Sequence, residues 1–174
     1  QGNNILCSNW DSNHMEELDY NGMYEYLYVM KYQKPFEPED YQEGIPKAEF
    51  ESLIMEYLPV TAEQIREYAV FDEKKQNYAW ERIGCFSYAP TFFGTSLPEV
   101  MDINENEDGT ITLTVDAVCD MVICDDAVIT HELTVRFADD GSFQYLRNNI
   151  LNDGIQDIPS YQYRIRKEQL RVKK

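Results

Sequence analysis

His131 is the side chain in this sequence best suited to acid–base or ligand chemistry. The alternation of apolar and polar residues from Ile129 to Phe137 predicts a strand that carries His131 on its apolar face. An imidazole in that position can titrate near neutral pH and serve as an acid, a base or a ligand. The alternative is that His131 is a buried, hydrogen-bonded core residue, in which case burial alone would lower its pKa. Both interpretations stay open: a core histidine, or a histidine inside the cavity of a curved sheet.

A second candidate site lies in the segment 84–98, which contains two glycines and two prolines. Its aromatic side chains could stack on sugar rings or anchor a partner protein, as tyrosine and phenylalanine do in the centres of interfaces. The alternative is that the segment lies over one end of the sheet and buries them. The candidate ligand-binding residues are therefore Tyr88, Phe92 and Phe93, together with His131.

The sequence offers only part of a zinc site. Cys119, Cys124 and His131 supply three of the four nitrogen or sulfur ligands that structural zinc requires. A local disulfide between the two cysteines is geometrically conceivable, but free cysteine also packs well as a small apolar side chain. We expect free thiols, no bound metal and no cofactor.

The overall composition narrows the classes of function. The sequence contains no GxSxG elbow, no phosphate loop, no HExxH and no GxGxxG, which favours a protein that is not an enzyme. Its net charge of −17, from 32 acidic and 15 basic residues, opposes binding to the phosphates of nucleic acids. The segment 161–174 differs from the rest, with six basic residues and one acidic residue. We expect it to be solvated, with contact to the acidic body or to an anionic surface as the alternative.

The elements that must position these residues are best defined between residues 98 and 151. Asp-Gly pairs at 108–109 and 140–141 separate alternating runs, which is a strong hairpin signal because glycine adopts positive φ without strain. The first turn begins like a calcium loop, but Val115 stands where a bidentate glutamate belongs, so we expect no specific calcium binding. The predicted meander has strands at Glu99–Asn104, Thr110–Val118, Val128–Ala138 and Ser142–Ile150.

Helices are predicted in the middle of the chain. Pro46 can open a helix over Lys47–Leu58, because a first helical position needs no N–H partner. Thr61 and Gln64 form a capping-box pattern for a second, short helix. The polar stretch 72–76 is flanked by apolar runs and predicts a hairpin. The first helix carries an apolar stripe made of Phe50, Leu53, Ile54, Tyr57 and Leu58.

Residues 1–46 are predicted to contain an arm, a buried strand and a loop. Met23–Tyr32 is aromatic and apolar on both sides, which predicts a buried strand, although its length does not exclude a helix. Residues 1–22 are polar and turn-rich, and we expect an N-terminal arm there. Residues 33–46 contain three prolines and an acidic cluster, which predicts a loop.

These elements predict one α+β domain over residues 1–174. Helices lie in the middle, strands cluster late, and the βαβ alternation of a parallel sheet is missing. A curved antiparallel meander would pack on one or two helices around a single core. This architecture is similar to the cystatin-like and NTF2-like folds.

Three regions also carry a resemblance to a protein family. They are IPKAEFESLIMEYLPVTAEQIREYAVFDEKKQNYAW, DGTITLTVDAV, and THELTVRF followed by DDGSFQYLRNNI. Over residues 10–165 the chain resembles uncharacterised exported lipoproteins of anaerobic Gram-positive bacteria. The resemblance implies an extracellular or cell-envelope location, with any lipid anchor attached before Gln1. It implies no activity for any residue.

The sequence therefore favours a non-catalytic binding or interaction domain of a cell-envelope or secreted protein. Its partner would be a protein, a carbohydrate or another small molecule. One alternative is a small-molecule pocket protein or enzyme that uses His131 in a curved-sheet cavity. A structural module of a larger surface protein is the other.

Overall fold

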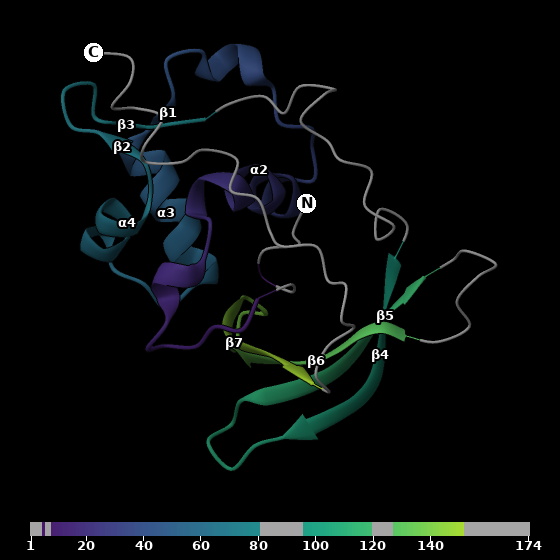
Figure 1. Cartoon of the computed structure of the whole chain (residues 1–174). Helices are drawn as coiled ribbons and strands as arrows, with labels where there is room; N and C mark the ends of the chain where they lie inside the picture. The colour runs from purple at the N-terminus through teal and green to yellow at the C-terminus, as the bar shows by residue number, and fades with distance from the viewer. Residues whose placement is uncertain (1–4, 6–7, 81–95, 120–126, 152–174) are drawn as a thin grey trace.

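The computed structural model describes residues 5, 8–80, 96–119 and 127–151. In these residues the helices and a small sheet lie on one side, and a larger antiparallel sheet lies on the other (Figure 1). The fold is therefore α+β, as predicted. The helical elements are η1 (Met15–Glu17), α2 (Tyr20–Tyr32), η2 (Pro38–Tyr41), α3 (Lys47–Tyr57) and α4 (Ala62–Tyr68). The strands are β1 (Ile45–Pro46), β2 (Phe71–Asp72), β3 (Asn77–Tyr78), β4 (Ser96–Glu105), β5 (Ile111–Cys119), β6 (Ala127–Phe137) and β7 (Phe143–Leu151).

The larger sheet is the predicted meander. Its strand order is β4-β5-β6-β7 and every neighbouring pair is antiparallel. Gly109 and Gly141 adopt φ of 78° and 84° in the two Asp-Gly turns, which only glycine enters easily. Of the four strands, β7 lies nearest the helices and β4 lies farthest from them (Figure 1). The helices therefore cover the sheet unevenly.

A bulge sets which side chains of β4 share a face. The register against β5 shifts between Val100 and Asp102, so Met101 is the extra residue. Val100 pairs with Val115 on one side of the bulge, and Ile103 pairs with Leu113 on the other side. The apolar face consequently continues across the bulge. The sequence pattern did not indicate this irregularity.

The predicted strand at Met23–Tyr32 is wrong, because these residues form most of helix α2. The Asp19 side chain caps the helix by accepting a hydrogen bond of 2.9 Å from the Gly22 N–H. Gln33 ends the helix in a left-handed conformation at φ 53°. Helix α2 is apolar on its buried side and also on its outer side, where Tyr26, Val29 and Tyr32 are 40%, 41% and 45% exposed. Such an all-round apolar pattern does not separate a helix from a strand.

Helix α3 confirms the predicted stripe, since Phe50, Ile54 and Tyr57 are all buried. Phe50 does not face the larger sheet, however. Its ring stacks between Tyr24 of α2, with centroids 5.0 Å apart, and Tyr78 of β3, with centroids 4.1 Å apart. Only the last turn of α3 reaches the larger sheet, where Tyr57 meets Phe143 edge to face at 5.6 Å.

The small sheet has the order β1-β3-β2 and includes the predicted hairpin around residues 72–76. The predicted capping box of α4 is also present, with reciprocal hydrogen bonds between Thr61 and Gln64. Asn21 connects α2 to this sheet. Its buried side chain donates to the carbonyls of Val70 and Ala79 and accepts from the Val70 N–H. The small sheet and the helices thus form one packed unit.

Candidate functional site

His131 lies on β6, opposite Val115 of β5 and Ile150 of β7. Its side chain is 2% exposed, on the same face as the buried Leu133 and Val135. The predicted burial on the apolar face is therefore confirmed. Phe137 belongs to the same alternating set but is 52% exposed, because it stands at the end of the strand, two positions beyond Val135.

The hydrogen-bond partner of His131 is Asn148 on the neighbouring strand. The His131 Nδ1 lies 2.6 Å from the Asn148 Oδ1. The amide nitrogen of Asn148 in turn donates 2.8 Å to the carbonyl of Ser8, so the amide oxygen must be the acceptor and the imidazole the donor. Neutral His131 is therefore protonated on Nδ1. Burial lowers the pKa of His131 below its ordinary value, although the Asn148 hydrogen bond and Asp116 act in the opposite direction.

The N-terminal segment covers this part of the sheet. Trp10 is buried and forms two backbone hydrogen bonds with Asn148, of 3.1 and 3.0 Å. The Asn9 side chain accepts a hydrogen bond of 2.7 Å from the Ile150 N–H. The Trp10 indole donates 2.7 Å to the carbonyl of Ile5. Residues of the expected arm thus contribute to the core and form hydrogen bonds with the outer edge of β7 at Asn148 and Ile150. The polar composition of residues 1–22 did not indicate this role.

Two carboxylates on α3 accept hydrogen bonds from buried or half-buried tyrosines. Glu49 accepts from Tyr24 at 2.9 Å and also from Tyr41. Glu51 accepts from Tyr78 at 2.8 Å. Burial, together with these carboxylates, raises the pKa of all three tyrosines. They stay protonated at neutral pH and connect elements rather than exchange protons.

Among the described residues, the most exposed large apolar side chains lie on β4. Val100, Met101 and Ile103 are 53%, 60% and 63% exposed. In the described part of the chain, β4 forms the outer edge of the larger sheet, so its outward backbone N–H and C=O groups face away from β5. We call this strand, with its three exposed apolar side chains, the open edge. Sequence alternation predicted the strand but not its exposure.

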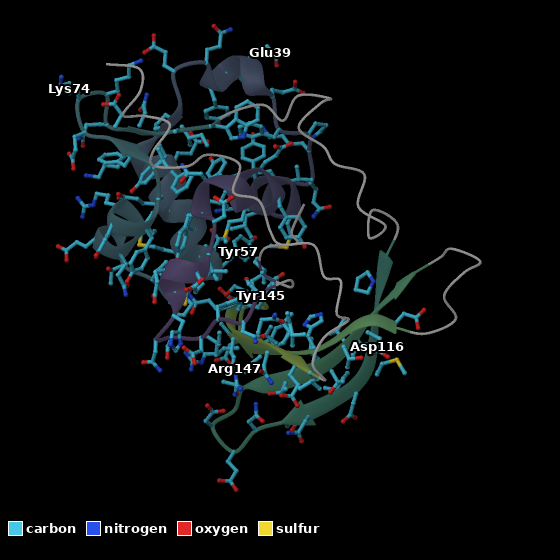
Figure 2. The ribbon with its side chains drawn as sticks, in the orientation of Figure 1. Glu39, Tyr57, Lys74, Asp116, Tyr145 and Arg147 are labelled. Carbon is cyan, nitrogen blue, oxygen red and sulfur yellow. The ribbon has the colours of Figure 1, made fainter. Side chains whose placement is uncertain are left out.

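The opposite face of the larger sheet is polar. Threonines pair across it, with Thr112 and Thr134 hydroxyls 3.2 Å apart and the Thr130 hydroxyl donating 2.6 Å to Asp116. Figure 2 shows Asp116 far from the helices, whereas Tyr57 and Tyr145 lie together where the helices meet the sheet. Carboxylates gather on this polar face toward β4, and Arg147 lies on β7.

Tyr88, Phe92, Phe93 and Cys124 lie outside the described residues, as does the basic segment 161–174. The described residues include no group of histidine, cysteine and carboxylate side chains that could hold a metal ion. In the Asp-Gly turn that begins like a calcium loop, the Asp108 carboxylate accepts from the Thr110 N–H and hydroxyl, at 3.0 and 2.6 Å. Those hydrogen bonds lower its pKa and stabilise the turn itself.

A model for a family of unknown function, DUF6070, matches residues 1–164. The chain belongs to this family. The match covers both sheets and all the described helices. Membership confirms that the chain resembles an uncharacterised family, while its export and lipid attachment stay predictions. No curated protein and no solved structure matches the chain.

The similarity to cystatin-like and NTF2-like folds stays a prediction, because it rests on architecture alone. Within the described ranges, every helix falls short of the length and apolarity that crossing a bilayer requires.

Proposed function

We propose that this DUF6070 domain is a non-catalytic interaction module that binds an extended segment of a partner protein along β4. The observation that carries the proposal is the open edge. Strand addition to a sheet edge gains main-chain hydrogen bonds, and alternate side chains of the added strand pack on the sheet face. In the described part of the chain the open edge supplies both requirements, since backbone groups that face away from β5 lie beside Val100, Met101 and Ile103.

The geometry around the histidines favours binding over catalysis. His131 is buried and hydrogen-bonded to an amide, and exposed His14 is hydrogen-bonded to Asp11 at 2.9 Å. Neither histidine contacts a hydroxyl or thiol nucleophile in the part of the chain that the structure describes. An extracellular or cell-envelope location belongs to the same proposal. It is supported by the resemblance of the sequence to exported lipoproteins, and fractionation of the native cells tests it.

Selection of displayed random peptides on the full chain tests the interaction. Each selected peptide is then measured on the parent chain, on Ile103→Asp and on Phe137→Asp. Both substitutions place a carboxylate on an exposed apolar position, but only Ile103 lies on β4. We expect binding to be lost with Ile103→Asp and retained with Phe137→Asp, and amide NMR shifts to change along β4. Equal binding to all three proteins, or the absence of any selected peptide, contradicts the proposal.

A further inference from the structure

We propose that the segment bound at the open edge is basic, with Lys or Arg alternating with apolar residues. This inference rests on the proposed function and specifies the chemistry of the partner. It starts from the side chains of β4 that point to the polar face of the sheet. Glu99 and Asp102 are three residues apart, yet both lie on that face, because the bulge at Met101 adds one residue between them.

Further carboxylates stand beside these two. Glu99 pairs with Asp116 of β5. Asp102 pairs with Thr114, which in turn pairs with Glu132 of β6. No ion pair that the structure describes includes any of these four carboxylates. A strand added beside β4 would place its polar-face side chains next to Glu99 and Asp102. Basic side chains of the added strand would be attracted to these carboxylates, and acidic side chains would be repelled.

The other face of β4 selects apolar residues. Val100 and Ile103 continue the apolar rows of Val115 and Leu113 toward solvent. An added strand therefore meets carboxylates on one face and aliphatic side chains on the other. Because the side chains of a regular strand alternate between faces, the matching sequence alternates basic and apolar residues.

The same carboxylates argue against a second copy of this chain as the occupant. If β4 paired antiparallel with β4 of a copy, the central registers would place Asp102 opposite the copy's Asp102 or its Glu99. Like charges directly opposite one another destabilise a strand pair. The net charge of −17 on each chain adds to the repulsion. The charges on β4 thus discourage self-association and favour a cationic partner.

The test uses the full chain and three labelled peptides of equal length, in which valine alternates with lysine, glutamine or glutamate. Fluorescence anisotropy gives the affinities, and amide NMR shifts locate the binding. We expect the lysine peptide to bind along β4 most tightly, with an affinity that falls as salt is added. The double variant Glu99→Gln/Asp102→Asn should weaken its binding about threefold to tenfold and leave the glutamine peptide unchanged. As a matched control, Glu37→Gln/Glu39→Gln removes two exposed charges elsewhere and should change neither affinity.

The outcomes separate the two proposals. If the glutamine and lysine peptides bind β4 equally, the basic partner is contradicted and the interaction module stands. If the lysine peptide binds equally to the double variant and the parent, the carboxylates do not select it and the inference fails. If no peptide shifts the β4 amides, both proposals fail together. Sedimentation of the peptide-free chain checks the argument about self-pairing, because a dimer broken by Ile103→Asp would make a second copy the occupant.

Discussion

Replacing Asn148 with alanine tests whether one buried amide holds the N-terminal segment on the sheet. The Asn148 side chain is 1% exposed and forms hydrogen bonds of 2.6 Å with His131 and 2.8 Å with the Ser8 carbonyl. A satisfied hydrogen bond contributes about 1 kcal/mol net, and a buried partner left unsatisfied costs about 1–3 kcal/mol. Because His131 and Ser8 both lose a partner, we expect Asn148→Ala to lower the free energy of unfolding by about 2–4 kcal/mol.

Urea denaturation followed by circular dichroism measures this change through linear extrapolation. The matched control is Asn149→Ala, which removes a half-buried amide from the neighbouring residue on the opposite face of β7, and it should change stability by less than about 0.5 kcal/mol. A loss below about 1 kcal/mol for Asn148→Ala, or equal losses for both variants, would refute the reasoning. Tryptophan fluorescence adds a local readout, since release of the segment exposes Trp10.

Three further predictions follow from the packing and the electrostatics. The pKa of His131 is lower in the folded state than in the unfolded state. The stability that His131 contributes is therefore present above its unfolded pKa, and it is lost as the pH falls through the unfolded pKa toward the folded pKa. Urea midpoints of the parent should consequently fall more steeply with decreasing pH than those of His131→Leu. Phe50→Ala should cost about 3–5 kcal/mol in a denaturant melt, because a ring between two aromatic neighbours leaves a cavity, and a cost below about 1 kcal/mol would mean that the stacking contributes little. Calorimetric titration with calcium should show no specific binding, since Asp108 is used within its own turn, and micromolar affinity would contradict this.

The meander could be predicted because its signals are local. Asp-Gly turns fix where the chain reverses, and the alternation of Ile111, Leu113 and Val115 with threonines fixes the faces. The burial of His131 followed from the same alternation. Helix α2 was mistaken for a strand because apolar residues lie on its exposed side as well as on its buried side, which hides the helical period, while its clearest local signal, the Asp19 cap, is a single residue.

The open edge could not be read from the sequence in the same way. Val100 and Ile103 look like core residues, and only the position of the helices over β7 rather than β4 leaves them exposed. The bulge at Met101 also cannot be recognised from the alternation of apolar and polar residues, because one extra residue only interrupts that alternation. The Asn148 partner of His131 lies on another strand, so its contact depends on the register rather than on spacing in the chain.

The pairing of Trp10 with β7 has a consequence for assembly. A sheet with two free edges can add strands at either side and continue to grow from molecule to molecule, which is how open sheets assemble into fibres. Here the outer edge of β7 is already occupied by the chain's own residues at Trp10, through hydrogen bonds to Asn148. Addition of β4 of one molecule to β7 of the next is therefore obstructed at Asn148, and head-to-tail growth of the sheet from molecule to molecule is not expected.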